Sequence, residues 1–315
     1  MKVLVVGATG AVGRPLLPQL LAAGHEVVAT ARHRPPELPR GVEFRTLDLL
    51  EDGAAAATVR DVRPAAIVHQ ATALTGLGNN LRAFDRSFAT TNRLRVEGTR
   101  SLIEATEDLE VPPRLVVQGF CGWPWAPTGA AAKSEADAWD PRPAPAFRRT
   151  LAALQELEEL VTGYPNGVVL RYAALYGPGT SLGRGGAQID AIRKRAFPLV
   201  GDAGATWSFL HVEDAAAAAV AALTHDSGIY NIADDHPVLI GEWLTHVARL
   251  TGSPPPRRIP VWLARLAGGE GLVHLMTRAR GSSNAKARRA LGWAPAHPDW
   301  HDGLAAELTH ETATT

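Results

Sequence analysis

Three glycines close to the N-terminus have a spacing that suits a phosphate group. The segment Gly7-Ala-Thr-Gly10-Ala-Val-Gly13 follows an apolar stretch typical of a strand, residues 2–6, and precedes a helical pattern. Glycines in this order let backbone N–H groups approach a pyrophosphate, while the start of the helix adds unpaired donors and a positive dipole. We therefore expect a dinucleotide to bind here. The residues expected to hold it are Gly7, Thr9, Gly10, Ala11, Val12 and Gly13.

The end of the next apolar stretch indicates which dinucleotide binds. An NAD-selective site offers a carboxylate there to the ribose hydroxyls, but this sequence reads Thr30-Ala31-Arg32. Arg32 can pair with a 2′-phosphate through charge-assisted hydrogen bonds, so we expect NADP(H), with NAD(H) as the alternative. A solvated basic loop is the simpler interpretation of Arg32. Asp48 and Leu49 stand where the adenine would lie, although an aspartate at a strand end is also a common turn former.

Short apolar runs alternate with amphipathic stretches through the first half of the chain. Strands are expected at residues 2–6, 26–30, 42–46, 65–69 and 115–118, with helices between them. Strands that are apolar on both faces predict a parallel sheet covered by helices on each side. The predicted fold class is therefore α/β, a Rossmann-type doubly wound parallel sheet.

Later segments predict further strands and a second, smaller region. Strands at residues 168–171, 207–212 and 229–232 are expected to continue the sheet, and Asp214 is expected to cap the alanine-rich helix after the second. Helical patterns at residues 240–250, 261–266, 285–291 and 303–308 predict a mainly helical C-terminal lobe. We expect the Rossmann domain to comprise residues 1–170 and 205–232, and the substrate-binding lobe residues 171–204 and 233–315.

Composition and charge limit the kinds of partner. Thirty-two basic and 32 acidic residues give a formal net charge of zero, so neither nucleic acid nor a membrane surface is expected as a partner. The apolar start is interrupted by Gly7 and Gly10, and no stretch approaches about 18 apolar residues, so we expect neither a signal peptide nor a membrane span. The single cysteine, Cys121, excludes an internal disulfide and offers no metal-ligand spacing. We expect a cytoplasmic protein that binds a small molecule and no metal. Whether it forms a homodimer is left undecided by the sequence.

Several motifs together resemble the extended short-chain dehydrogenase/reductase family, in its NAD-dependent epimerase/dehydratase branch. They follow the family's order along nearly the whole chain: GATGAVG, LDLLED, IVHQATAL, VEGTRSLIEA, VVLRYAALYGPG, WSFLHVEDAAAAAVAAL and NAKARRALGWAP. The resemblance implies that Gln70, Ala71 and Thr72 line the nicotinamide ribose. It also implies that Arg171 and the Tyr176-Gly-Pro-Gly turn close the site near the nicotinamide.

The catalytic residues depart from the pattern of this family. Its members usually carry a Ser or Thr after the fifth strand and a Tyr-x-x-x-Lys pair on the next helix. Here the hydroxyl position aligns with Gly119, and Phe147 and Leu151 stand at the positions of the pair. Phe147 cannot act as an acid, and Leu151 cannot hold ribose. Arg95 occupies the place of a frequent asparagine, while Asn92 lies a turn earlier. The chain therefore resembles an atypical subgroup of the family.

Without that phenol, a reduction that ends in an alkoxide needs another acid. Our candidates for catalytic residues are Gln118, Cys121, Tyr176 and His211. Cys121 follows the fifth strand and His211 can titrate near neutral pH, but each type of side chain is also typical of a buried structural position. Gln118 can polarise a carbonyl without supplying a proton, and Tyr176 can donate one from the cleft.

Aromatic residues after the fifth strand indicate the kind of substrate. Trp123 and Trp125 follow it directly, in the crevice beyond the carboxyl ends where open parallel sheets bind ligands. Together with Phe147, and with Arg171 from the resemblance, they are our predicted substrate contacts. Such a wall is drier than one that binds a nucleotide sugar, so we expect an apolar or aromatic substrate. Packing in a core is the alternative role for the tryptophans.

The leading hypothesis is an atypical NADP(H)-dependent oxidoreductase of the extended family that acts on a small, apolar or aromatic organic compound. One alternative is a non-redox isomerase, dehydratase or cyclase that retains the dinucleotide, and it would show no hydride exchange. Another is a non-catalytic NADP(H) sensor, which would distinguish oxidised from reduced dinucleotide without turnover.

Overall fold

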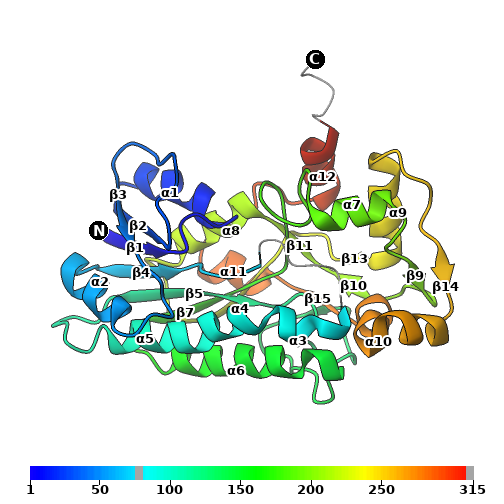
Figure 1. Cartoon of the computed structure of the whole chain (residues 1–315), viewed down its shortest axis with the longest axis horizontal. Helices are drawn as coiled ribbons and strands as arrows, with labels where there is room; N and C mark the ends of the chain where they lie inside the picture. The colour runs from blue at the N-terminus through cyan, green and yellow to red at the C-terminus, as the bar shows by residue number, and fades with distance from the viewer. Residues whose placement is uncertain (75–80, 310–315) are drawn as a thin grey trace.

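A computed structural model describes residues 1–74 and 81–309. Seven strands form its main sheet: β1 (Lys2–Val6), β2 (Glu26–Ala31), β3 (Val42–Thr46), β4 (Ala66–His69), β5 (Arg114–Phe120), β7 (Gly167–Tyr172) and β12 (Gly228–Ile232). All pairings in this sheet are parallel, and the strand order is β12-β7-β5-β4-β1-β2-β3 (Figure 1). The predicted Rossmann-type doubly wound parallel sheet is confirmed.

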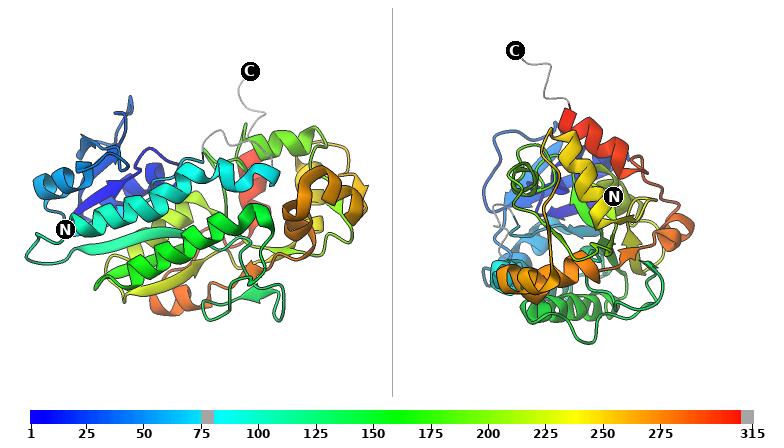
Figure 2. Two further views of the ribbon diagram at one scale, coloured as in Figure 1. Left: turned by 60° about the horizontal axis from the view of Figure 1, so that its bottom comes forward. Right: turned by 90° about the vertical axis from the view of Figure 1, so that its right-hand side faces the viewer.

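Helices cover both faces of the sheet because side chains alternate along each strand. Val3 and Val5 of β1 belong to a core shared with helices α1 (Gly13–Ala22) and α8 (Val212–Ala221). Leu4 and Val6 belong to the core on the opposite face, which α2 (Ala54–Val62), α5 (Thr99–Glu104) and α6 (Arg148–Thr162) cover. Figure 2 shows α5 and α6 lying side by side on this second face.

The helical segment that leads into α5 changes its hydrogen-bonding pattern midway. It begins with a 3₁₀ turn, η1 (Leu81–Ala83), and two short helices, α3 (Phe84–Ser87) and α4 (Ala89–Arg93). A π-helical turn, η2 (Leu94–Gly98), then connects α4 to α5, and the backbone stays helical at both of its ends. Single π-helical turns inside longer helices are frequent at functional sites.

A third hydrophobic core lies mainly among the C-terminal helices. Its largest side chains include Trp123, Phe147, Trp243 and Trp300. The remaining helices are α7 (Ala187–Arg193), α9 (Ile240–Leu250), α10 (Val261–Thr277), α11 (Ala285–Ala290) and α12 (Trp300–Thr309), and η3 (Pro145–Phe147) leads into α6. Four short strand pairs tie the segments together: β6 (Ala132–Lys133) with β15 (Gly281–Ser282), β8 (Ala174–Tyr176) with β11 (Phe209–His211), β9 (Leu199–Val200) with β14 (Arg258–Ile259), and β10 (Thr206–Trp207) with β13 (Val238–Leu239). Among the described residues, no helix has the length and apolar character needed to cross a membrane. The predicted domain boundaries stay a prediction.

Two local predictions are wrong. The strand expected at residues 207–212 is divided between β10 and β11, and neither joins the main sheet. Ser208 lies between them, and its hydroxyl donates a hydrogen bond to the carbonyl of Ser282 and accepts one from the N–H of the same residue. The cap of α8 is His211, whose Nδ1 accepts a hydrogen bond from the N–H of Glu213 at 3.4 Å. Asp214 instead accepts hydrogen bonds from two backbone N–H groups at residues 296–297, so it fixes the C-terminal segment against α8.

Candidate active site

The glycine segment forms a tight loop between β1 and α1, against the end of β4. Gly7 has a φ of +86°, and a Cβ there would lie 2.5 Å from the backbone nitrogen of Ala71. A Cβ on Gly13 would lie 2.4 Å from the carbonyl oxygen of Gly7. The N–H of Gly10 donates to the carbonyl oxygen of Gly7 at 3.1 Å, which closes the turn. Helix α1 begins at Gly13 without a side-chain cap, so the N–H groups of residues 11–13 are available to a ligand. The loop, with Thr9, Ala11 and Val12 in it, fits the pyrophosphate of a dinucleotide.

The residues expected around the adenosine follow β2 and β3. Arg32 is exposed directly after β2. The side chain of Asp48 accepts a hydrogen bond from the N–H of Leu50 at 3.0 Å, which is a turn-forming contact. Leu49 is buried and packs against Gly98 of the π-helical turn. The assignment of these three residues to the cofactor stays a prediction.

The residues expected around the nicotinamide ribose follow β4. Gln70 is buried and donates a hydrogen bond to the hydroxyl of Tyr172 at 3.2 Å. Its backbone carbonyl accepts one from the side chain of Gln118 at 3.3 Å. Gln118 of β5 is thereby held beside the end of β4, where Ala71 and Thr72 are partly exposed. The structure therefore brings together four of the residues that the sequence predicts at this end of the site.

Apolar side chains occupy the positions of the family's hydroxyl and amine groups. Phe147 is fully buried, and its ring centre lies 4.5 Å from that of Trp123 and 4.7 Å from that of Phe84. Leu151 is also buried. A Cβ on Gly119 would lie only 2.9 Å from a methyl carbon of Val169, so a larger residue there would require a shift. An aromatic cluster consequently stands where other members of the family have their acid.

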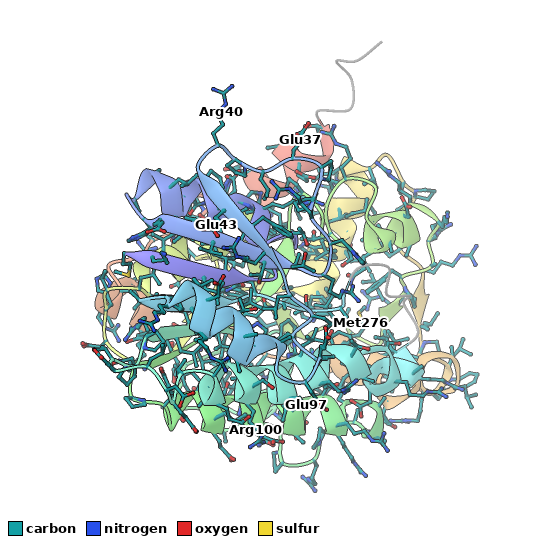
Figure 3. The ribbon with its side chains drawn as sticks, turned by 60° about the vertical axis from the view of Figure 1, so that its left-hand side comes forward. Glu37, Arg40, Glu43, Glu97, Arg100 and Met276 are labelled. Carbon is teal, nitrogen blue, oxygen red and sulfur yellow. The ribbon has the colours of Figure 1, made fainter. Side chains whose placement is uncertain are left out.

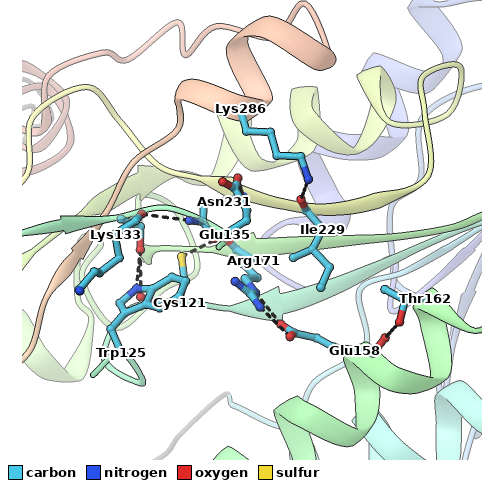
Figure 4. Close-up of polar contacts among 11 residues, drawn as sticks. Cys121, Trp125, Lys133, Glu135, Glu158, Thr162, Arg171, Ile229, Asn231 and Lys286 are labelled. Carbon is cyan, nitrogen blue, oxygen red and sulfur yellow. Dashed lines mark hydrogen bonds and ion pairs between the residues drawn. The ribbon is translucent and has the colours of Figure 1, made fainter. Parts of the chain in front are cut away.

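Cys121 lies at the end of β5 with its side chain inside the protein. Its Sγ donates a hydrogen bond to the backbone carbonyl of Arg171 at 3.1 Å (Figure 4). Burial raises the pKa of Cys121 to about 12. The thiol is therefore protonated at neutral pH and is a weak acid. Its predicted catalytic role stays untested, as does that of Gln118.

Tyr176 and His211 lie together near the start of α8. The Tyr176 hydroxyl is buried and has no hydrogen-bond partner within residues 1–74 and 81–309, and a Cβ on Gly303 would lie 2.1 Å from its oxygen. Burial raises the pKa of Tyr176. The ring centre of His211 is 5.1 Å from that of Tyr176, and burial followed by repulsion from His297 lowers the pKa of His211. His211, Glu213 and His297 have ligand atoms within 4.8 Å of one another, so the absence of a metal stays a prediction.

Trp125 and Arg171 belong to a buried network between β7 and α6. Two guanidinium nitrogens of Arg171 donate to the carboxylate of Glu158 at 2.6 and 2.7 Å (Figure 4). The guanidinium carbon lies 4.1 Å from the ring centre of Trp139 and 5.2 Å from that of Trp125. The indole N–H of Trp125 donates to the hydroxyl of Ser282. Both predicted substrate contacts are thus engaged by partners within the protein.

The sequence did not reveal that a charged side chain is buried near the end of β4. Arg95, in the π-helical turn, is 5% exposed, and its charge has no carboxylate partner among the described residues. The sequence marked it only as a departure from the family pattern. The available signal was an arginine flanked by Leu94 and Val96, at a place where an uncharged side chain is usual.

The fold and the glycine loop together define a dinucleotide-binding Rossmann protein. The profile of the NAD dependent epimerase/dehydratase family matches residues 3–233, which is more than half of the chain. The chain therefore belongs to this family, as its motifs indicated.

Two relatives of the chain are named as enzymes. It is 43% identical over 313 residues to a 3-diazoavenalumate denitrifying reductase from a Streptomyces species, covering 98% of this chain and 100% of that protein. It is 34% identical over 203 residues to a dTDP-6-deoxy-L-talose 4-dehydrogenase (NAD(P)(+)) from Kitasatospora kifunensis, covering 61% of this chain and 59% of that one. The crystal structure of a Thermus thermophilus UDP-glucose 4-epimerase in complex with NAD matches all of both chains with a TM-score of 0.69 and 23% identity. The chain is an enzyme of the NAD dependent epimerase/dehydratase family.

Proposed function

We propose that this enzyme is an NADPH-dependent reductase that removes the diazonium group of a small aromatic carboxylate as N2. The proposal is supported by the relative from Streptomyces, which is named a denitrifying reductase of 3-diazoavenalumate and is similar to this chain along its whole length. That name describes an anion with a diazo group. An aromatic anion is compatible with the apolar or aromatic substrate that the sequence predicts.

The observation that carries the proposal is the apolar replacement of the proton donor, Phe147 and Leu151, both buried among apolar side chains. NADPH, when bound, supplies a hydride to the ring carbon that bears the diazonium group. A carbon–hydrogen bond forms, the carbon–nitrogen bond breaks, and its electron pair leaves with N2. The organic product is the parent arene, the dinucleotide ends as NADP⁺, and no proton is taken up. A site without an acid is therefore sufficient for this reaction, whereas a carbonyl reduction needs an acid for the alkoxide.

The aromatic cluster supplies the remaining requirements of such a reaction. Trp123, Phe147 and Phe84 form one packed group, with Trp123 and Phe84 edge to face at 5.7 Å. An aromatic wall attracts a cation through its ring faces and excludes water, which would otherwise add to the reactive carbon. We assign the substrate's ring to the neighbourhood of this cluster.

The preference for NADP(H) is also part of the proposal. Arg32 ends the β2 segment where an NAD-selective site has a carboxylate, and its exposed guanidinium is available to a 2′-phosphate. The buried Leu49 and the partly buried Asp48 complete this end of the site.

A reaction on a sugar nucleotide without net oxidation or reduction is the second candidate. The fold similarity to a UDP-glucose 4-epimerase favours it. The absence of a tyrosine and lysine at residues 147 and 151 argues against it, because the transient oxidation of a sugar hydroxyl to a ketone needs a base to take the hydroxyl proton. A non-catalytic sensor, the third hypothesis from the sequence, is not supported by the two relatives described above, because both are named as enzymes.

The stoichiometry of the reaction tests the proposal. The purified enzyme is mixed with NADPH and ¹⁵N-labelled 4-carboxybenzenediazonium, and NADPH loss, labelled N2 and benzoate are measured together. We expect the three quantities to be equal, at a rate well above that of the same mixture without protein. NADPH consumption without N2 release, or a rate equal to the protein-free control, would contradict the proposal.

A further inference from the structure

The π-helical turn η2 carries a buried positive charge. Arg95 is 5% exposed, and one terminal nitrogen donates to the amide oxygen of Asn92 at 3.1 Å. Its Nε is buried and has no hydrogen-bond partner in the described part of the chain. Burial lowers the pKa of Arg95 to about 10, which still leaves the guanidinium charged at neutral pH. Glu97 and Arg100, which follow it along the helix, reach the surface (Figure 3), so Arg95 faces the opposite way.

Hydrogen bonds hold this turn against the segment that follows β4. Thr91 lies one helical turn before Arg95, and its hydroxyl accepts a hydrogen bond from the N–H of Ala73 at 3.1 Å. The carbonyl oxygen of Leu94 lies 3.1 Å from Nε2 of His69, the last residue of β4. The turn is therefore adjacent to the end of β4, where the nicotinamide side of the site is expected.

On its other side the turn is bound to the start of α6. The amide nitrogen of Asn92 donates to the hydroxyl of Thr150 at 3.1 Å, one residue before Leu151. Asp85 accepts hydrogen bonds from the N–H and the hydroxyl of Thr150 at 2.9 and 2.7 Å. Two uncharged side chains thus separate the carboxylate of Asp85 from the guanidinium of Arg95. The charge of Arg95 therefore lies on a turn between the end of β4 and the start of α6, and no neutralising group faces it among the described residues.

An uncompensated guanidinium inside a protein is costly, so its retention calls for an anion that arrives later. Arg171 provides the internal comparison, because it is equally buried and has a two-pronged contact with Glu158. The fork of an arginine matches the two oxygens of a carboxylate in the same way. The pyrophosphate of the dinucleotide already has the glycine loop as its partner.

We propose that Arg95 binds the carboxylate of the substrate and thereby sets the orientation of its aromatic ring in the crevice. This inference rests on the proposed function for the class of substrate, an aromatic carboxylate. It adds a specificity-determining residue: the diazonium end of the molecule would lie at the nicotinamide, and the carboxylate end at the π-helical turn. Uncharged aromatic compounds of the same shape should bind more weakly.

The test is a calorimetric titration of the enzyme, saturated with NADP⁺, by cinnamate and by cinnamamide, which have nearly the same shape but differ in charge. We expect the wild type to bind cinnamate about tenfold to hundredfold more tightly, as for one charge-assisted contact. In Arg95→Gln the two compounds should bind equally, with the affinity for NADP⁺ unchanged. Arg95→Lys keeps the charge without the fork and should retain part of the preference. Arg100→Gln, which removes an exposed arginine from the same helix, should retain all of it.

The thermal midpoint of the ligand-free variants separates a binding role from a structural one. Removal of an uncompensated charge should leave the midpoint of Arg95→Gln equal to that of the wild type or above it. A lower midpoint with the cinnamate preference intact would overturn the inference, and so would cinnamate binding no more tightly than cinnamamide to the wild type. Loss of NADP⁺ affinity in Arg95→Gln would assign the residue to the dinucleotide instead. Because the titration involves no turnover, absent N2 release would refute the proposed function without changing this result.

Discussion

Replacing Glu158 by glutamine should destabilise the enzyme strongly while leaving substrate affinity intact. The sequence places Arg171 at the substrate, but its guanidinium is bound by Glu158 through two hydrogen bonds of 2.6 and 2.7 Å, and both side chains are almost fully buried. In Glu158→Gln the charge of Arg171 remains inside the protein without its counter-ion. Removing one partner of a buried pair costs about 3–5 kcal/mol.

The geometry indicates a value near the lower end of that range. The glutamine oxygen still accepts one of the two hydrogen bonds, and the guanidinium keeps its contacts with Trp139 and Trp125. We therefore expect Glu158→Gln to lower the free energy of unfolding by about 3 kcal/mol, a large part of the 5–15 kcal/mol typical of a domain. Arg171→Met combined with Glu158→Leu should recover most of this loss, because no charge is then left buried.

Urea denaturation followed by circular dichroism measures these differences. Arg100→Gln is the matched control, because it breaks an exposed ion pair with Glu156 on the same helix α6 and should cost no more than about 1 kcal/mol. A loss below 1 kcal/mol in Glu158→Gln would refute the structural role of the pair. If Glu158→Gln had unchanged stability but weaker substrate binding, Arg171 would instead be a substrate contact, as the sequence predicted.

Three further predictions concern the cofactor, the missing acid and pH. Arg32→Ala should remove about 1–3 kcal/mol of the preference for NADPH over NADH in fluorescence titrations, and equal affinities in the wild type would contradict the NADP(H) assignment. Phe147→Tyr combined with Leu151→Lys should not accelerate N2 release, because the reaction takes up no proton, and a tenfold gain in turnover would show that an acid is limiting. Burial lowers the pKa of His69 from 6.5 to about 4, so its contribution is present above pH 6.5 and is lost as the pH falls toward 4. That loss is about 3 kcal/mol in the free energy of unfolding. In His69→Gln the free energy of unfolding, measured by urea denaturation at several pH values, should fall less than in the wild type between pH 6.5 and 4. An equal fall in both proteins would show that His69 does not cause this pH dependence.

The sheet was predictable from the sequence because its signals are local. Four of the five strands in the first half are short apolar runs, β3 alternates apolar with charged residues, and the glycine loop follows the first strand. The division of residues 207–212 into β10 and β11 was not predictable, since it depends on Ser208 bonding to Ser282, far along the chain. The cap of α8 was misassigned for a similar reason, because Asp214 has its partners at residues 296–297.

The sequence predicted which residues make up the candidate site, but it predicted few of the contacts between their side chains. The replacement of the phenol by Phe147 can be recognised from spacing alone, whereas the packing of its ring on Trp123 and Phe84 requires the tertiary structure. Arg171 illustrates the same limit, because a charged residue at a strand end looks available until its partner on α6 is known. Arg95 is the opposite case, because only its contacts show that no carboxylate among residues 1–74 and 81–309 neutralises it.

Transfer of deuterium from labelled NADPH tests the central claim most directly. The enzyme is incubated with 4-carboxybenzenediazonium and NADPH that carries deuterium on either face of the nicotinamide C4, and the benzoate formed is analysed by mass spectrometry and NMR. The account predicts one deuterium at the carbon that carried the diazonium group, from one face of the nicotinamide only. Benzoate without deuterium, or a product that keeps its nitrogen, would contradict it.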